Sequence, residues 1–228
     1  MMPVVDVVVV AVDAEATIVE VLAGLAARHI RHVYVVDRPG GAAGRLAHAH
    51  GAITLRETRR GYGAACRRGV AHIVAASSPP DIVLFMHGGG ADDPADVESI
   101  VRPIERQGLD LVIGSRALGD DDAPRRLRDR VGREVAIGLI RAIYGQRYTD
   151  LGGFRAIRLR ALVSLGLSDD GPGYSVEMQV KAVKCGLRVA EVPVHRRRTA
   201  PRPVATLRER AVGSGKVLYT ILRHATAR

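Results

Sequence analysis

The sequence predicts a single α/β domain with a mostly parallel central sheet and helices on both of its faces. Short runs rich in Val and Ile alternate with helical stretches over the first two thirds of the chain, a spacing typical of doubly wound sheets. These runs are continuously apolar instead of alternating with polar residues, which indicates strands that are covered on both faces. A length of 228 residues suits one domain with a substantial core.

Five strands are expected in this first part, each a short apolar run bounded by Gly, Asp or Pro, at residues 4–12, 32–37, 52–56, 81–86 and 110–113. The intervening segments are expected to be helices, at residues 15–29, 44–50, 61–76 and 94–107. The last of these helices has the clearest start. Asp93 is a typical N-cap, Pro94 suits the first helical position, and Asp96 favours the positive end of the helix dipole.

The pattern of strands and helices changes after Arg116. A polar turn leads into an expected helix at residues 124–144, whose apolar residues share one face while arginines crowd its first half. The remaining expected elements are helices at 158–165 and 175–185, a strand at 188–194 and a basic amphipathic helix from Pro203 onward. No internal repeat or linker interrupts the sequence, so we expect residues 1–228 to form one domain.

The positive charge of the chain is concentrated near its end. The formal net charge is +10, and residues 196–228 contain nine Lys or Arg but one acidic residue, Glu209. Such a segment indicates an anionic partner, either phosphate groups, a lipid head-group surface or nucleic acid; alternatively it is a solvated basic helix. Nucleic acid is disfavoured, because aromatic residues make up 4% of the chain and no helix-turn-helix or zinc pattern is present.

Cysteine usage and hydropathy indicate a cytoplasmic chain, either soluble or peripheral at the inner face of the membrane. Cys66 and Cys185 lie far apart without C-x-x-C spacing, which is typical of small hydrophobic residues in a reducing compartment. Apolar runs such as residues 7–12 fall far below the roughly 18–20 residues that span a bilayer. Asp6 interrupts the first apolar run at once, so no secretory leader is expected.

Ligands of open α/β sheets bind beyond the carboxyl ends of the strands. Four segments of this chain are expected there, at residues 11–15, 37–40, 87–94 and 114–116. The first of these turns lacks a glycine-rich fingerprint, and Gly61-Tyr62-Gly63 lacks the third glycine of such a motif. A dinucleotide-binding Rossmann domain is therefore disfavoured.

Seven short segments stand in a characteristic order along the chain. They are VVD at 35–37, RGYGAA at 60–65, DPAD at 93–96, DLVIGSR at 110–116, DLGGFRA at 150–156, VEMQ at 176–179 and EVPV at 191–194. In this order and spacing the sequence resembles the bacterial family 2 glycosyltransferases of the GT-A fold, the group that contains the dolichyl- and polyprenyl-phosphate sugar synthases. The resemblance runs from Val5 to about Ile221, nearly the whole chain.

The resemblance implies transfer of a sugar from a nucleotide-diphosphate donor to a lipid-phosphate or other hydroxyl acceptor. Residues 4–116 would then form a nucleotide-binding half, residues 117–202 an acceptor half and residues 203–228 a basic C-terminal helix. The acceptor would be a polyprenyl phosphate or another molecule at the membrane surface. A protein partner or a second copy would help a lone domain to reach it. The alternative is a non-catalytic relative that binds a nucleotide, an anionic lipid or a protein.

The resemblance also implies which residues contact the nucleotide: Ala11, Asp13, Glu15, Asp37, Gly63, His87 and Arg116. Carboxylates there would accept hydrogen bonds from the ring N–H and the hydroxyl groups of the donor. For Asp13, Glu15 and Asp37 the alternative is turn chemistry, because Asp at strand ends commonly caps helices and turns. Arg116 would neutralise the diphosphate with its fork of donors.

Two acidic residues are implied as catalytic. Asp150 begins the DLGGFRA segment and would take a proton from the attacking hydroxyl or orient the surroundings of an acceptor phosphate; alternatively it caps the turn before Gly152. Glu177 follows a polar loop and is similarly placed; alternatively it lies on an exposed helix face.

The sequence departs from the family where a divalent cation normally binds. The family has Asp-x-Asp at the end of the fourth strand, and this chain has His87-Gly88-Gly89. Mg²⁺ or Mn²⁺ prefers oxygen ligands, so a cation would need a shifted site at His87 and Asp92. Alternatively, arginine charge replaces the cation, a role open to Arg38, Arg116, Arg198 and Arg202, the last two as phosphate-binding residues of the tail.

Two other donor-facing loops depart from the family as well. The loop after Asp37 would normally read Asn/Asp-Gly-Ser-x-Asp but reads Arg-Pro-Gly-Gly-Ala at residues 38–42. The first loop is reduced to Asp13-Ala14-Glu15. Together these changes predict altered donor binding or a loss of catalysis.

Overall fold

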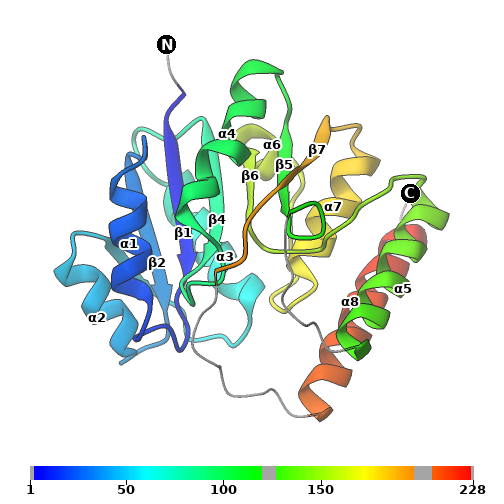
Figure 1. Ribbon diagram of the computed structural model, residues 1–228, viewed down its shortest axis with the longest axis horizontal. Helices are drawn as coiled ribbons and strands as arrows, with labels where there is room; N and C mark the ends of the chain where they lie inside the picture. The colour runs from blue at the N-terminus through cyan, green and yellow to red at the C-terminus, as the bar shows by residue number, and fades with distance from the viewer. Residues whose placement is uncertain (1–2, 120–126, 198–206, 227–228) are drawn as a thin grey trace.

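A seven-stranded sheet runs through the molecule in the computed structural model, which describes residues 3–119, 127–197 and 207–226 (Figure 1). The strand order is β3-β2-β1-β4-β6-β5-β7. The strands are β1 (Val5–Val10), β2 (His32–Asp37), β3 (Ile53–Arg56), β4 (Ile82–His87), β5 (Leu111–Ser115), β6 (Arg155–Arg158) and β7 (Val189–Pro193). All five strands expected in the first part of the chain are present, and the single α/β domain that the sequence predicts is confirmed.

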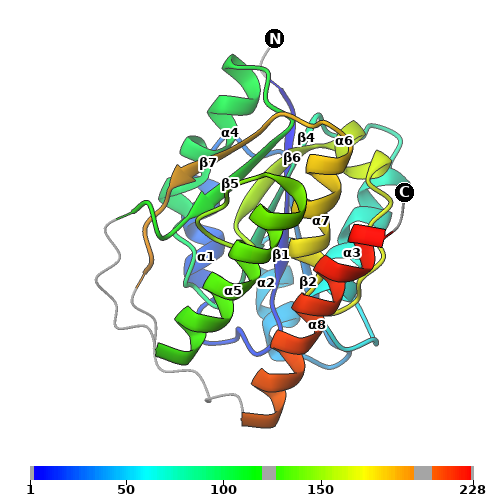
Figure 2. The ribbon, with the colours of Figure 1, turned by 90° about the vertical axis from the view of Figure 1, so that its right-hand side faces the viewer.

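Helices cover both faces of the sheet (Figures 1 and 2). They are α1 (Ile18–Ala26), α2 (Ala42–Ala49), α3 (Tyr62–Val74), the short 3-10 helix η1 (Pro94–Asp96), α4 (Val97–Arg106), α5 (Leu127–Tyr144), α6 (Leu159–Ser164), α7 (Tyr174–Lys184) and α8 (Leu207–Thr226). Helices α5 and α8 lie side by side at the edge of the molecule. In the described part of the chain, no helix is long and apolar enough to cross a membrane.

Two hydrophobic cores explain why the strands are continuously apolar. Val7 and Val9 of β1 pack with α1, α2 and α4, whereas Val8 and Val10 pack with the helices of the other face. Alternate residues of a strand point to opposite faces, so a strand with a core on each side needs apolar residues throughout. The sheet interior therefore follows directly from the valine-rich sequence.

Strand β6 was not expected from the sequence. It lies antiparallel between β4 and β5, so the two predicted halves of the chain share one sheet. Its four residues begin and end with arginine, and Arg155 is 1% exposed. A buried arginine hides the apolar pattern by which a strand is recognised, and the expected helix at 158–165 begins only at Leu159.

The start of the expected helix at 94–107 is confirmed in part. The Asp93 side chain accepts a hydrogen bond from the Ala95 backbone N–H at 2.9 Å, as an N-cap does. The first three residues form η1 rather than an α-helical turn, and α4 begins at Val97. Asp96, expected only to favour the helix dipole, is buried.

A buried ion pair fixes the start of β1. Asp6 of β1 is fully buried, and both of its oxygens accept hydrogen bonds from Arg31, at 3.0 Å from Nε and 2.7 Å from Nη2. Arg31 also donates its backbone N–H to the Val5 carbonyl at 2.9 Å. The one acidic residue in the first apolar run is thereby neutralised.

Removing one partner of this pair should therefore be costly. We expect Arg31→Ala to lower the free energy of unfolding by about 3 kcal/mol, because the Asp6 carboxylate is left buried and uncompensated. Urea unfolding followed by circular dichroism measures the change. The double variant Asp6→Ala/Arg31→Ala should recover part of the loss, and a single variant as stable as the double variant would contradict this account.

Candidate active site

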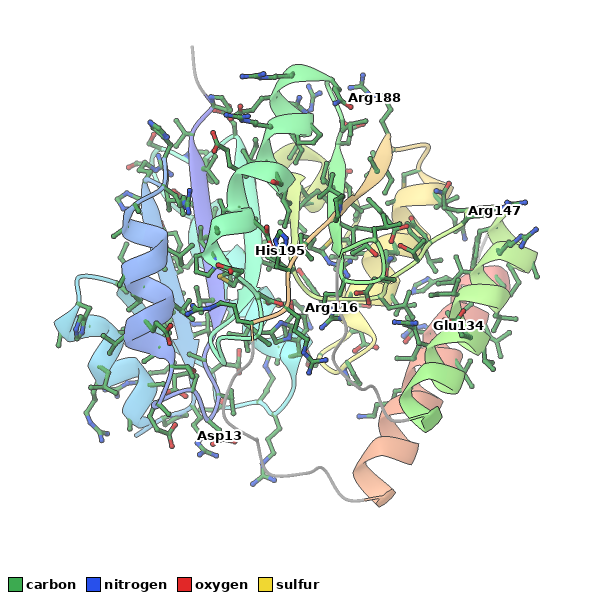
Figure 3. All side chains as sticks on the ribbon, in the orientation of Figure 1. Asp13, Arg116, Glu134, Arg147, Arg188 and His195 are labelled. Atoms are coloured by element: carbon green, nitrogen blue, oxygen red, sulfur yellow. The ribbon has the colours of Figure 1, made fainter. Side chains whose placement is uncertain are left out.

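The loops that follow β1, β2, β4 and β5 meet at the carboxyl edge of the sheet, the lower edge in Figure 3. The Ala11 N–H donates to the Val36 carbonyl at 2.9 Å, and the Gly88 N–H donates to the Val10 carbonyl at 2.8 Å. A Cβ atom on Gly88 would lie 3.0 Å from the Ala11 Cα. Gly88 therefore lets the loops after β1 and β4 pack directly against each other.

His87, at the end of β4, is held from three sides. Its Nδ1 lies 3.2 Å from Asp92 Oδ2, which also accepts the His87 backbone N–H at 2.9 Å. Its ring stacks on Tyr62, with centroids 4.7 Å apart and an interplanar angle of 18°. A Cβ atom on Gly153 would lie 2.4 Å from the His87 ring, so that glycine completes the seat. Since Nδ1 is engaged, Nε2 is the ring nitrogen left for a ligand.

Asp92 is buried beneath His87. Burial alone would raise the pKa of its carboxyl group, but the hydrogen bonds and charge of His87, with the nearby Arg116 charge, hold that pKa below its ordinary value. Asp92 is therefore an ionised carboxylate whose hydrogen bonds fix the orientation of the histidine.

The chain that follows β7 is fastened across the loop after β4. The Asp96 carboxylate accepts the His195 backbone N–H at 2.6 Å and lies 2.9 Å from His195 Nδ1. Asp92 and Arg196 form an isolated antiparallel β-bridge, and the Arg197 backbone N–H donates to the Ala91 carbonyl at 3.1 Å. This fastening brings the basic stretch at the end of β7 next to His87 and Asp92.

Arg116 and Asp150 form the central ion pair of the site. Arg116 Nε donates to Asp150 Oδ2 at 2.9 Å and Nη2 donates to Oδ1 at 3.2 Å, a two-pronged contact, while the Arg116 backbone N–H donates to Oδ2 at 3.1 Å. Asp150 is buried, whereas the Arg116 side chain is 30% exposed. Burial would raise the pKa of Asp150, but the guanidinium keeps it below its usual range.

The backbone of Asp150 is itself held by two residues that sequence reasoning did not select. The Glu191 carboxylate accepts the backbone N–H groups of Thr149 and Asp150, with the shortest contact at 2.8 Å, and Gln179 donates to the Asp150 carbonyl at 3.0 Å. Burial raises the pKa of Glu191 despite these hydrogen bonds. Both residues lie in segments that carried the family resemblance, which was the signal that could have identified them.

Arg155 supports the same turn from below. It is fully buried and donates to the carbonyls of Ser175, at 2.8 Å, and of Gly152. Burial lowers the pKa of the Arg155 guanidinium, whereas the nearby Tyr62, Tyr148, Cys66 and Asp150 act in the opposite direction. The segment 150–155 thus begins with a carboxylate that orients Arg116 and ends with a cation that fixes Gly152.

Glu177 is buried and lies in a different network. Its carboxylate accepts the backbone N–H groups of Ser168 and Asp169, at 3.0 and 2.8 Å, and pairs with Lys181 at 2.7 Å. Burial would raise the pKa of Glu177, but these partners lower it more, so the pKa lies below its ordinary value. The exposed-face alternative is therefore wrong, and the carboxylate fastens the loop before α7; a catalytic role for it stays a prediction.

Two of the residues predicted to contact the nucleotide, Asp37 and Asp13, bond to groups of the neighbouring loops. Asp37 accepts the N–H groups of Arg38 and Gly44, at 2.7 and 2.8 Å, so it caps the turn into α2. Asp13, at a backbone φ of 56°, forms an ion pair with Arg38, and Glu15 is exposed. Nucleotide contacts by these residues and by Ala11 stay predictions.

Gly63 lies against a neighbouring loop. Its N–H donates to the Gly171 carbonyl at 3.1 Å, and a Cβ atom there would lie 2.0 Å from the Asp169 carbonyl oxygen. The glycine is therefore required for packing between α3 and the loop 169–171. A contact between Gly63 and the nucleotide stays a prediction.

The donor atoms near His87 do not fit a hard divalent cation. Mg²⁺ and Mn²⁺ prefer several oxygen ligands, yet His87 and Asp92 bond to each other and the Arg116 charge lies close to Asp92. Within residues 3–119, 127–197 and 207–226, no group of three or more His, Cys, Asp or Glu side chains could hold a metal ion. Arg198 and Arg202, the predicted phosphate-binding residues, lie outside the described residues.

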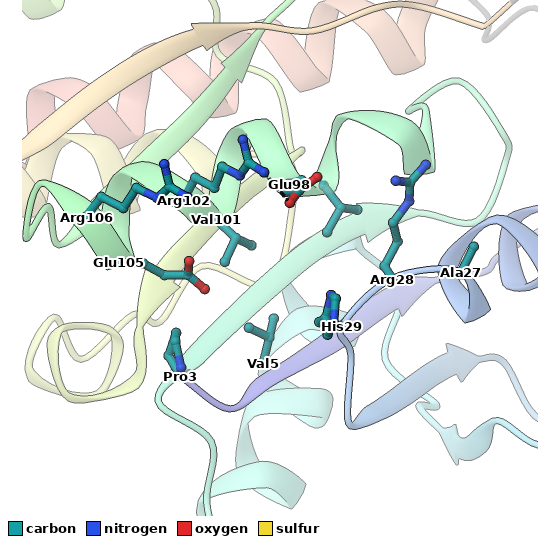
Figure 4. A pocket seen from close by; sticks show the side chains of 11 residues that line it. Pro3, Val5, Ala27, Arg28, His29, Glu98, Val101, Arg102, Glu105 and Arg106 are labelled. Carbon is teal, nitrogen blue, oxygen red and sulfur yellow. Dashed lines mark hydrogen bonds and ion pairs between the residues drawn. The ribbon is translucent and has the colours of Figure 1, made fainter. Parts of the chain in front are cut away.

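A cavity of about 300 Å³ lies away from these residues, between α1 and α4 (Figure 4). Its floor includes Val5 and Val101, and its rim carries both signs of charge, with Arg102 paired to Glu98 at 2.7 Å. None of the predicted site residues that the structure describes lines it. The mixed charge distinguishes this cavity from the basic surroundings of the carboxyl edge.

The buried carboxylates predict sensitivity to acid. The folded-state pKa values of Asp150 and Glu177 lie below the ordinary 3.8 and 4.5. Their stabilisation is therefore present above the ordinary values and lost as the pH falls through the folded-state values. We expect the free energy of unfolding, from urea titrations, to decrease as the pH is lowered from about 5 to about 2. Glu177→Gln should reduce this dependence, whereas the exposed Glu98→Gln should not; equal slopes in both would contradict the assignment.

Comparison with known proteins agrees with this architecture. The family model of glycosyl transferase family 2 matches residues 6–166. An uncharacterised glycosyltransferase of Mycobacterium tuberculosis is 32% identical over 191 residues, which cover 83% of this chain and 84% of the relative. Glycosyltransferase AglJ of Haloferax volcanii is 29% identical over 181 residues, which cover 78% of this chain and 57% of the relative.

Two solved structures share the fold. Glucosyl-3-phosphoglycerate synthase from Mycobacterium tuberculosis, solved with Mg²⁺ and UDP, has a TM-score of 0.78 at 23% identity, covering 98% of this chain and 79% of that one. Mannosyl-3-phosphoglycerate synthase from Rubrobacter xylanophilus has a TM-score of 0.76 at 18% identity, covering 97% of this chain and 74% of that one. With the family match over most of its length, the chain belongs to glycosyl transferase family 2.

Proposed function

We propose that this protein transfers a hexosyl group from a nucleotide-diphosphate donor to a lipid-phosphate or other hydroxyl acceptor, without a resident divalent cation. The observation that carries the proposal is the cluster of His87, Asp92, Arg116 and Asp150 at the carboxyl edge of the sheet. A similar fold binds UDP in the glucosyl-3-phosphoglycerate synthase complex, which supports a nucleotide-diphosphate donor here.

Arg116 is proposed to stabilise the leaving diphosphate. Charge accumulates on the bridging oxygen as the sugar–phosphate bond breaks, and a guanidinium fork already held in place lowers the energy of that charge. Asp150 holds the fork through the two-pronged contact, while the partial exposure of Arg116 leaves it accessible to a ligand. With Arg116 kept in place, an oxygen of the Asp150 carboxylate would also accept the proton of the acceptor hydroxyl.

His87 is proposed to bind the same diphosphate through Nε2. Asp92 accepts the hydrogen bond of Nδ1, and the Tyr62 stack fixes the ring plane. With Nδ1 donating to Asp92, Nε2 donates as well only in the imidazolium form, so we propose that His87 binds the diphosphate in that form, where the family resemblance implies a cation. Together with Arg116, the His87 ring would supply the positive charge that a metal ion held by the Asp-x-Asp motif supplies in the family.

Conservative variants of the central ion pair test this division of roles. We expect Arg116→Lys to lower kcat/KM for the donor about 100-fold, because the charge remains but the fork is lost. Asp150→Asn should lower kcat at least as strongly, since the base and the orienting charge are both removed. The exposed Arg102→Lys serves as control. Folded Arg116→Lys protein with unchanged kcat/KM would contradict the proposal.

Nucleotide binding separates transfer from the binding-module alternative. We expect UDP or GDP, and the corresponding nucleotide sugars, to raise the Tm of the wild-type protein in EDTA, because binding to the folded state stabilises it. His87→Ala should reduce the shift, and donor turnover should accompany it. A response to nucleotide without turnover would favour a non-catalytic relative, and no response to any nucleotide would overturn the proposed function.

The acceptor is proposed to be met at an anionic membrane surface, on the inner face of the membrane. Tyr219 and Leu222 of α8 are 64% and 52% exposed, and Val135 of the adjacent α5 is 52% exposed. Lys216 and Arg223 lie three and four residues from Tyr219, so they flank the apolar strip of α8. Exposed apolar residues bordered by cations fit a peripheral helix on anionic lipid.

Liposome co-sedimentation tests this surface. We expect binding to vesicles that contain anionic lipid, weaker binding at high salt, and a several-fold loss in Tyr219→Ser/Leu222→Ser because buried apolar area is lost. Val163→Ser on α6, where the side chain is 53% exposed, is the matched control. Binding that is independent of anionic lipid would contradict the membrane proposal but not the transfer chemistry.

A further inference from the structure

A second cavity opens at the carboxyl edge, at β2 and β3, and so toward the other end of the strand order from Arg116. It has a volume of about 340 Å³ and lies between α2 and the ends of β2 and β3. Strands β1 and β2 separate β3 from β4, which ends at His87. The cavity is therefore distinct from the diphosphate subsite proposed above.

The lining of this cavity is strongly basic. Arg38, Arg45, His48 and Arg56 all contribute to it, and the acidic residue of its lining is Asp37. Both carboxylate oxygens of Asp37 accept backbone N–H groups of the loop, at 2.7 and 2.8 Å, so its charge is directed into the fold. In the part of the chain that the structure describes, no carboxylate pairs with Arg45 or Arg56.

The backbone around the cavity is shaped by glycines. Gly40 has a φ of 77°, and a Cβ atom on Gly41 would lie 2.0 Å from Asp37 Oδ2, so the loop can turn closely around that carboxylate. Arg45 Nη1 donates to the Gly40 carbonyl at 2.9 Å, which holds the guanidinium over the same loop. The loop that the family resemblance predicts to be acidic is thus a basic, glycine-rich turn.

We propose that this cavity binds a phosphate group, with Arg45 and Arg56 as its principal ligands and Arg38 at its edge. A phosphate carries about two negative charges and accepts several hydrogen bonds, which matches guanidinium forks that lack carboxylate partners. The proposal goes beyond sugar transfer and does not depend on it. The phosphate belongs either to a separate phosphate-bearing ligand or to the nucleotide donor.

Inorganic phosphate and pyrophosphate are the probes that test the site. We expect each to raise the Tm of the wild-type protein more than sodium chloride at equal ionic strength, and calorimetry to show about tenfold weaker binding in Arg45→Gln/Arg56→Gln. Arg102→Gln/Arg106→Gln, which removes two arginines from the mixed-charge cavity of Figure 4, should bind as the wild type does. Arg56→Gln alone keeps the Arg45–Gly40 contact and should still weaken binding.

Titrations with UDP and GDP identify the source of the phosphate. A nucleotide shift that adds to the phosphate shift and survives in Arg45→Gln/Arg56→Gln indicates a separate ligand. Competition between the two, with both shifts lost in that variant, indicates the donor. No phosphate effect beyond that of chloride, or equal affinity in the double variant, overturns the site. Failure of the proposed function would differ, because no nucleotide sugar would then be turned over while phosphate still bound.

Discussion

The ion pair between Arg116 and Asp150 is the interaction on which the rest of the site depends. It joins the end of β5 to the turn before β6, two segments 34 residues apart. The unexpected antiparallel β6 places that turn between β4 and β5. Glu191 on β7 and Gln179 on α7 then fix the Asp150 backbone. Residues from four elements therefore act together to orient the Arg116 guanidinium at the carboxyl edge of the sheet.

Charge is distributed unevenly along this edge. Buried carboxylates at Asp92 and Asp150 stay ionised because cationic or hydrogen-bonding groups face them, and each orients the group that it contacts. Asp37 likewise serves its own loop, where three arginines line the neighbouring cavity. Asp37, Asp92 and Asp150 each position another group, whereas arginines line the cavity beside Asp37. That arrangement suits the binding of anionic ligands better than the binding of a metal cation.

Much of the fold followed from the sequence because valine-rich strands buried on both faces leave a continuous apolar pattern. Strand β6 did not, since Arg155 interrupts that pattern and its hydrogen bonds to the carbonyls of Gly152 and Ser175 are visible only in three dimensions. The family resemblance selected Arg116 and Asp150, which the structure brings together. It did not select Glu191, and it left the role of Glu177 open, because a carboxylate that fastens a backbone loop has the same sequence signature as one that faces a ligand.

Donor turnover with and without a divalent cation tests the central claim most directly. The measurement is the rate of release of UDP or GDP from a nucleotide sugar, in EDTA and in Mn²⁺, for the wild-type protein and for Arg116→Lys. If oriented cationic side chains stabilise the leaving diphosphate, the wild-type rate in EDTA should equal that in Mn²⁺, and Arg116→Lys should lower both. Turnover that requires Mn²⁺ and is insensitive to Arg116→Lys would contradict the account.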